Sequence, residues 1–253
     1  MKIEGSSALV TGGGSGLGEA TARMLAARGA IVHVMDLNEG AAARVAAEIG
    51  GVAIAGDVAS EADAERAITR AAEAGDGLRI LVNCAGIGPA ARVIGRDGPM
   101  PLADFERVIR VNLVGTFNMM RLAAARMADL PERADKARGA IVNTASVAAT
   151  DGQIGQVAYS ASKGAIVSMA LPAAREFARF GVRVNTIAPG IFATPLLKSL
   201  PVDVQQSLAA SIPYPSRLGD PAEYADAVRF CIESQYLNAE VIRLDGAIRM
   251  QPK

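Results

Sequence analysis

Short apolar runs alternate with longer amphipathic segments from one end of the chain to the other. Seven runs have the length and composition of strands: residues 8–10, 31–35, 52–55, 80–82, 140–142, 182–187 and 241–244. Stretches of helix length, such as 16–28 and 102–128, lie between them. Continuously apolar strands that alternate with helices are typical of a parallel sheet with both faces covered. The pattern therefore predicts one α/β domain, residues 1–253, with a doubly wound, mostly parallel sheet and helices on both faces.

Three polar or Pro/Gly-rich stretches interrupt this alternation. Residues 89–101 and 131–138 are predicted to form surface loops, and residues 194–221 carry five prolines around a short helical piece at 202–211. In an open α/β sheet, a long irregular segment after a strand end lies where ligands bind. We therefore expect 194–221 to form a lid over a binding site; the alternative is an ordinary surface excursion.

Charge and composition bear on the partners of the chain. Its 253 residues include 26 Lys+Arg and 26 Asp+Glu, and this balance gives no electrostatic reason to expect nucleic acid or an anionic membrane. A hydrophobic content of 51% is high for a soluble monomer and favours further burial in an oligomer. No apolar stretch reaches the ~18 residues of a membrane-spanning helix.

Cysteine and histidine usage narrows the chemistry. Cys84 and Cys231 give no disulfide framework, and an apolar strand begins within a few residues of Met1 without a separate leader segment. We therefore expect a cytoplasmic protein. His33, the one histidine, lies within an apolar run, so a packed His33 is favoured over a catalytic one and no metal site is expected.

A glycine-rich loop follows the first predicted strand and opens the first predicted helix. Its sequence at residues 11–18 is TGGGSGLG, in which Gly12, Gly16 and Gly18 have a spacing that differs from the common G-x-G-x-x-G. Glycines let the backbone approach a pyrophosphate, and the helix N-terminus offers free N–H groups to that anion. Glycine clusters often form only turns, but this strand–loop–helix context predicts a dinucleotide site.

Residues at the ends of the next strands extend this predicted site. Asp36 ends the second strand, where a carboxylate can accept hydrogen bonds from both ribose hydroxyls and repel a 2′-phosphate; its alternative role is a helix cap. Neither the glycine loop nor position 37 carries a cation, so these positions together with Asp36 favour NAD over NADP. Asp57 and Val58 end the third strand, at the expected adenine edge. Small residues that let the backbone approach the cofactor follow the fourth strand: Asn83, Cys84, Ala85 and Gly86.

Tyr159 and Lys163 lie four residues apart, so they share one face of a predicted helix. A nearby cation favours the phenolate and lowers the pKa of tyrosine from its usual value of about 10. Ser146 lies just beyond the strand that precedes this helix. We expect Tyr159 to act as general acid/base, Ser146 to hydrogen-bond the substrate oxygen, and Lys163 to lower the pKa of Tyr159 and hold the ribose. Asn112 is expected to hold a water that connects Lys163 to solvent, unless it is an ordinary polar helix residue.

Together these motifs resemble the short-chain dehydrogenase/reductase family over nearly the whole chain. The matches are T-G-x-x-x-G-x-G at 11–18, N-x-A-G at 83–86, Asn112, Ser146, Y-x-x-x-K at 159–163, and Pro189 with Gly190. The resemblance implies a seven-stranded Rossmann-like sheet and hydride transfer between a nicotinamide and a hydroxyl or carbonyl. It also implies a homotetramer, in which the helices that start near Leu102 and Val157 pack between subunits, and places Pro189 and Gly190 at the cofactor.

A closer resemblance lies in segments that most of this family lacks. Residues 143–149, 187–197, 215–224 and 240–252 look like the type-2 3-hydroxyacyl-CoA dehydrogenases, also described as type 10 17β-hydroxysteroid dehydrogenases. The match implies NAD-dependent oxidation of an (S)-3-hydroxyacyl-CoA to a 3-ketoacyl-CoA, in fatty-acid or branched-chain amino-acid breakdown, by a bacterial-type cytoplasmic enzyme. It implies NAD contacts by Ser15, Leu17, Asp36, Asp57, Val58, Cys84, Phe192 and Thr194.

Three other functions fit parts of the pattern. A steroid or other secondary-alcohol dehydrogenase would use the same residues, because these residues contact only the carbinol group of the substrate. An NADPH-dependent β-ketoacyl reductase would normally carry a cation near residues 14, 15 or 37, and none is present. A non-catalytic NAD-sensing protein on this fold would usually lack the tyrosine or the lysine. The loops at 89–101 and 131–138 match less well, so the acyl-chain preference stays open.

Overall fold

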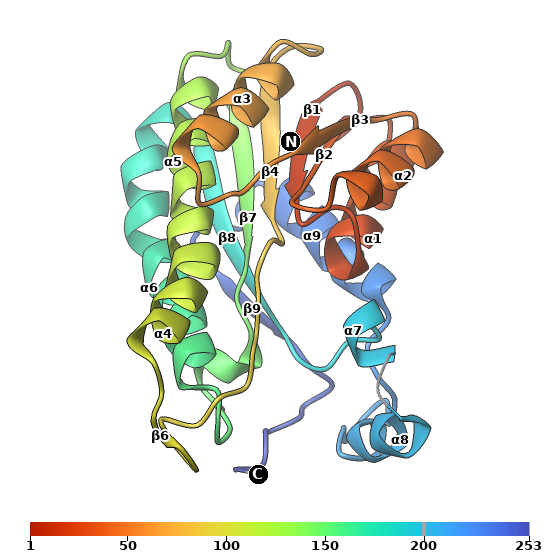
Figure 1. The fold of residues 1–253 in the computed structure, drawn as a ribbon. Helices are drawn as coiled ribbons and strands as arrows, with labels where there is room; N and C mark the ends of the chain where they lie inside the picture. Colours follow the sequence, from red (N-terminus) through yellow and green to blue (C-terminus); the bar gives the residue numbers. More distant parts are fainter. Residues whose placement is uncertain (199–200, 253) are drawn as a thin grey trace.

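The computed structural model describes residues 1–198 and 201–252, and within them seven strands form one parallel sheet (Figure 1). The strand order is β3-β2-β1-β4-β7-β8-β9. The strands are β1 (Ser7–Thr11), β2 (Ile31–Asp36), β3 (Val52–Ala55), β4 (Leu78–Asn83), β7 (Gly139–Thr144), β8 (Val182–Pro189) and β9 (Val241–Leu244). All seven predicted runs are strands, and every neighbouring pair is parallel. The prediction of a doubly wound α/β fold is confirmed.

Helices cover both faces of the sheet, because successive side chains of each strand point to opposite faces. Ala8 and Val10 pack in a buried cluster with α1 (Gly16–Ala27), α2 (Glu39–Ile49) and α9 (Pro221–Glu233). Leu9 packs in a second cluster with α3 (Glu61–Ala72), α5 (Gly115–Ala128) and α6 (Val157–Phe177). Figure 1 shows these two layers on opposite sides of the strands.

The segment predicted as one helix, 102–128, contains an irregular turn. It divides into α4 (Leu102–Ile109), the π-helical turn η1 (Arg110–Val114) and α5. Asn112 within η1 is fully buried, and its amide accepts from the Ile87 N–H at 2.8 Å and donates to the Ile87 carbonyl at 2.8 Å. This two-point contact with the loop after β4 holds the wider turn in place, and such turns are frequent at functional sites.

The three predicted irregular stretches lie at the surface and differ in detail. The stretch 89–101 contains a small hairpin, β5 (Ile94–Gly95) with β6 (Gly98–Pro99). The segment 194–221 contains α7 (Pro195–Lys198) and α8 (Val202–Ala210), and residues 199–200 of it lie outside the described residues. A bridge between Phe192 and Gly219 joins the two ends of this segment, so it forms a closed excursion from the sheet edge.

The longest helix of the described residues, α6, is not apolar enough to span a bilayer, and neither is any other helix in that part of the chain.

Candidate active site

The site lies at the carboxyl ends of the central strands, where the strand order reverses between β1 and β4. In open α/β sheets this switch point leaves a crevice, because successive connections run to opposite faces. The loop after β1, the loop after β4 and the segment after β7 meet there. The sequence-predicted residues from these three connections are therefore brought to one edge.

The glycine loop has no room for side chains on its inner side. Gly12 has φ +63°, and a Cβ there would lie 2.7 Å from the Ala85 nitrogen. A Cβ on Gly18 would overlap the Gly12 carbonyl oxygen. Ser15, the N-cap of α1, makes no side-chain capping bond within the described chain, so the first N–H groups of the helix stay available for an anion. This cradle fits the pyrophosphate of a dinucleotide.

Asp36 is fixed at the rim of the cradle. Its carboxylate accepts from the Gly14 N–H at 3.0 Å and from the Asn38 N–H at 2.9 Å. The cap of α2 is Asn38, whose side chain accepts from the Ala41 N–H at 3.0 Å, so Asp36 is not the helix cap. The arrangement fits the predicted ribose contact, since the carboxylate keeps unused lone pairs beside the loop.

The predicted residues after β3 lie at the rim of the crevice, whereas Asn83 at the end of β4 lies behind it, between the strands. Asp57 and Val58 lie in the turn before α3, beyond the last residue of β3, Ala55, rather than at the strand end itself. Asn83 is 3% exposed and its amide donates to Asn143 Oδ1 at 2.9 Å, so its side chain ties strand ends together and does not face the crevice. The predicted approach of the backbone of residues 83–86 to the cofactor stays a prediction.

Gly86 lies between two of the predicted catalytic residues. A Cβ on Gly86 would meet Asn112 Oδ1 at 3.2 Å and Lys163 Nζ at 3.5 Å. Cys84 and Ala85 precede it and are partly buried. Burial raises the pKa of the Cys84 thiol, so this residue is a packed thiol as the sequence indicates.

The start of the segment 194–221 reaches the glycine loop. A Cβ on Gly16 would lie 3.3 Å from the Thr194 methyl group, which places Thr194 beside the cradle as predicted. Phe192, by contrast, is 7% exposed, and its ring packs edge-on against Tyr224 with centroids 6.4 Å apart. Its ring therefore belongs to the core, and any contact of Phe192 with a cofactor must come from its backbone. Pro189 and Gly190 lie at the end of β8, where Gly190 N–H donates to the Leu244 carbonyl at 2.8 Å.

Tyr159 and Lys163 project from the same face of α6, with Lys163 Nζ 5.7 Å from the centre of the phenol ring. A Cβ on Gly88 would lie 3.4 Å from the ring, so the loop after β4 passes directly over Tyr159. Burial raises the pKa of Tyr159 above its usual value, and the hydrogen bond with Ser146 offsets this only in part. The expected lowering by Lys163 is not observed, since burial dominates and the ammonium donates to the Thr144 carbonyl.

Lys163 is 4% exposed and donates from Nζ to the Thr144 carbonyl oxygen at 2.8 Å. Burial disfavours the ammonium and lowers the pKa of Lys163 to about 8. At neutral pH the side chain is still mostly charged. It therefore offers a buried cation, anchored to the end of β7, to a hydroxyl group placed in the crevice.

The low pKa of Lys163 has a measurable consequence. The chain has five lysines, and the ¹³Cε resonance of Lys163 is the one that disappears in Lys163→Met. We expect this resonance to titrate near pH 8 in protein purified without cofactor. Between pH 8 and 10.5 the unfolded chain keeps a proton on this lysine that the native protein has lost, so the contribution of Lys163 to the free energy of unfolding rises with pH in this window. Titration of that resonance above pH 10 would contradict the burial of an unpaired ammonium.

The side chain of Asn112 joins the loop after β4 to α6. In addition to its two bonds with Ile87, its amide donates to Ser162 Oγ at 3.0 Å, and Ser162 lies next to Lys163 on α6. Both of its N–H donors are therefore engaged, which leaves one Oδ1 lone pair toward the space shared with Lys163. Asn112 positions the loop after β4 relative to α6; the predicted water contact remains a prediction.

A buried hydroxyl chain behind Lys163 was not foreseen from the sequence. Thr144 Oγ1 donates to the Asn83 carbonyl at 2.5 Å, and Tyr224 OH lies 2.6 Å from Thr144 Oγ1. Since Thr144 has one proton to donate, Tyr224 must be the donor of the second bond. The chain locks the ends of β4 and β7 and thus the carbonyl that holds Lys163. Its only sequence signal is a tyrosine in an otherwise ordinary helix.

Comparisons with known proteins agree with this geometry. The family model of the short chain dehydrogenases matches residues 6–205. The chain is 52% identical to 3-hydroxyacyl-CoA dehydrogenase type-2 of Bos taurus, over 99% of this chain and 97% of that protein. It is 33% identical to the human (3R)-3-hydroxyacyl-CoA dehydrogenase, over 98% and 97%. The crystal structure of 3-hydroxyacyl-CoA dehydrogenase type-2 from Mycobacterium avium superposes with a TM-score of 0.95, at 43% identity and 98% coverage of each chain.

Proposed function

Because this chain belongs to the short-chain dehydrogenase family, we propose that it catalyses the NAD-dependent, reversible oxidation of an (S)-3-hydroxyacyl-CoA to the 3-ketoacyl-CoA. The observation that supports the chemistry best is the meeting of Tyr159, Ser146 and Lys163 at the edge that carries the glycine cradle. The acyl-CoA substrate is supported by relatives named 3-hydroxyacyl-CoA dehydrogenase type-2, at 50–52% identity over 99% of this chain.

Each of these side chains has a distinct task. A bound nicotinamide cofactor accepts or supplies the hydride. Ser146 Oγ accepts from the Ala148 N–H at 3.1 Å, so its own proton can be donated to the Tyr159 phenol or to the substrate oxygen. Tyr159 removes the hydroxyl proton during oxidation and returns it during reduction. Lys163, held by the Thr144 carbonyl, stabilises the negative charge that forms on Tyr159 and binds the ribose.

NAD is favoured over NADP by the carboxylate at the rim. Asp36 is held by two backbone N–H groups and stays beside Gly14, where an added 2′-phosphate would meet its negative charge. The decisive assay is reduction of acetoacetyl-CoA with NADH and with NADPH. We expect catalytic efficiency with NADH to exceed that with NADPH by about 100-fold; equal efficiency, or no turnover, would refute the proposal.

The main alternative is a dehydrogenase of steroids or other secondary alcohols. The same three catalytic residues would serve it, and the lid segment decides which alcohol enters. A panel of acyl-CoA, hydroxysteroid and simple alcohol substrates ranks the two by catalytic efficiency. We infer that the acyl-CoA gives the highest value; a hydroxysteroid that exceeds it would shift the assignment.

The two cysteines, Cys84 and Cys231, are free thiols, which supports function in the reducing cytoplasm.

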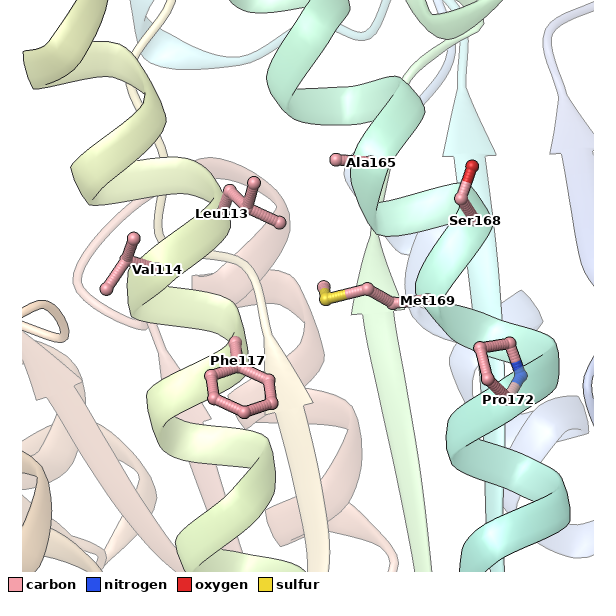
Figure 2. A pocket seen from close by; sticks show the side chains of 7 residues that line it. All are labelled: Leu113, Val114, Phe117, Ala165, Ser168, Met169 and Pro172. Atoms are coloured by element: carbon pink, nitrogen blue, oxygen red, sulfur yellow. The ribbon is translucent and has the colours of Figure 1, made fainter.

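The homotetramer is supported by an apolar hollow between η1/α5 and α6 (Figure 2). Its lining residues are Leu113, Val114, Phe117, Ala165, Ser168, Met169 and Pro172. Two of these apolar side chains are exposed to solvent in the single chain: Phe117 of α5 by 48% and Val114 of η1 by 44%. A second copy related by a two-fold axis would bring the same helices against this hollow, since a self-complementary patch is what such symmetry requires.

Phe117→Glu tests the oligomer directly. A charge in the centre of the hollow is expected to split the tetramer into smaller species, because a desolvated carboxylate there would lack a partner. Light scattering coupled to size exclusion gives the mass. Ile94→Glu, on the β5–β6 hairpin outside the hollow, should leave the mass unchanged. A Phe117→Glu protein that remains tetrameric would exclude this face as the interface.

A further inference from the structure

The structure brings a cation to the glycine loop that the loop's own sequence does not contain. Arg44, on α2, donates from Nη2 to the Gly14 carbonyl oxygen at 3.0 Å. The N–H of the same Gly14 donates to Asp36 at 3.0 Å. One residue of the cradle is therefore held between the carboxylate that meets the ribose and a guanidinium. An arginine in that position is the feature expected of a site for a 2′-phosphate.

Arg44 is not a free cation, because Glu19 of α1 pairs with it through both oxygens. The contacts are 2.8 Å from Nη2 to Oε2 and 3.1 Å from Nη1 to Oε1. Planar two-point pairing of this kind is the strong form of an arginine–carboxylate bond. The hydrogen bond from Arg44 is the main cause that holds the pKa of Glu19 below its ordinary value.

A second acidic residue, Glu48, belongs mainly to another arginine. Its closest contact is with Arg23, and this bond is the main cause that lowers the pKa of Glu48. Glu48 lies 3.4 Å from Arg44 Nη1, a longer contact than either contact of Glu19. Glu48 is therefore a matched control: it carries the same charge in the same cluster and contacts Arg44 only at the longer distance. Arg23 also donates to Glu19 Oε1 at 2.8 Å, so both carboxylates share this second arginine.

We propose that Glu19 is a specificity-determining residue, which neutralises and holds Arg44 on the outer side of the glycine loop so that no cation is free to attract a 2′-phosphate. The inference rests on the proposed NAD site. Asp36 repels the 2′-phosphate and Glu19 withdraws the charge that would compensate for it, so NAD preference depends on both carboxylates. Arg44 keeps a second task, to brace the Gly14 peptide against the cofactor.

The test measures dissociation constants of NADH and NADPH by the fluorescence of the bound nucleotide. The proteins are the wild type, Glu19→Gln, Arg44→Met, the double variant and Glu48→Gln. Glutamine keeps the shape of Glu19 and removes its charge. We expect Glu19→Gln to tighten NADPH binding about fivefold and to change NADH binding by less than about twofold, because only NADPH presents a further anion near Arg44.

The set of variants shows whether tighter NADPH binding requires Arg44 or only the loss of the negative charge of Glu19. In the Arg44→Met background, Glu19→Gln should change NADPH binding by less than about twofold, and Glu48→Gln in the native background should do the same. Equal tightening with and without Arg44, or no tightening at all, would overturn the role of Glu19. If the wild type already binds NADPH as tightly as NADH, the proposed NAD preference fails, yet the difference between the two backgrounds still decides the role of Glu19. Thermal melting curves confirm that each variant is folded.

Discussion

Tyr159→Phe is expected to lower the turnover number for acetoacetyl-CoA reduction by about 1,000-fold or more, while NADH binding changes by less than about twofold. The substitution removes one oxygen and keeps the ring that lies under Gly88. Without the phenol no group at this position can give the proton to the new alkoxide. The cofactor cradle, formed by the backbone around Gly12 and Gly18, is left intact.

The control for this variant is Tyr236→Phe, because Tyr236 is fully exposed at 102%. Its turnover should equal that of the wild type. Turnover is measured from the loss of NADH absorbance, and binding from NADH fluorescence. If Tyr159→Phe kept more than about a tenth of the wild-type turnover, another proton donor would have to act and the assignment of Tyr159 would be wrong.

Ser146→Ala should have the second largest effect, a loss of about 100-fold in turnover with little change in NADH binding. The hydroxyl is oriented by the Ala148 N–H, and it hydrogen-bonds the Tyr159 phenol in the cofactor-free protein. Its removal takes away a donor aimed at the oxygen where charge develops. It also removes the contact that partly offsets the raised pKa of Tyr159, so the pH at which oxidation reaches half its maximum should rise.

A neighbouring serine provides the matched control for Ser146. Ser160 is on α6 next to Tyr159, and its hydroxyl has no hydrogen-bond partner among the described residues. Ser160→Ala should change turnover by less than about twofold. Equal losses in both variants would mean that the region tolerates no change at all, and the specific role given to Ser146 would be contradicted.

The sequence was sufficient for the fold and for the order of the site. The strands β1, β4, β7 and β8 are buried on both faces, so their apolar pattern is continuous and local. The edge strands β3 and β9 are only partly buried, yet they are apolar enough to be found, and observed boundaries differ from prediction by a few residues at most. The glycine loop and the pair Tyr159–Lys163 were also readable, because their geometry depends on short spacings within one element or turn.

Contacts between distant segments could not be predicted in this way. The π-helical turn at Asn112 depends on Ile87, and the position of Lys163 depends on the Thr144 carbonyl, 19 residues away in the chain. Arg44 is 30 residues from Gly14, and nothing in the local sequence of α2 indicates that its side chain returns to the loop. Each of these contacts is set by packing of the finished sheet and not by periodicity.

The direction of the pKa shift of Tyr159 is a second property that could not be predicted from the sequence. Spacing alone suggested that the Lys163 charge would lower it, but the buried phenol has a raised pKa and the ammonium is bound to Thr144. Desolvation outweighs the charge in the cofactor-free protein, since the two groups are not in direct contact. The spacing of Tyr159 and Lys163 therefore does not by itself set the direction of this pKa shift.

Stereochemistry and cofactor together provide the sharpest single measurement. The purified protein is supplied with (S)- or (R)-3-hydroxybutyryl-CoA and with NAD⁺ or NADP⁺, and the initial rate of nicotinamide reduction gives kcat/KM for the four pairs. The (S) substrate with NAD⁺ should exceed each of the other pairs by about 100-fold or more. A preference for the (R) substrate, the stereochemistry in the name of the human (3R)-3-hydroxyacyl-CoA dehydrogenase, would contradict the function proposed for this site, and so would a preference for NADP⁺.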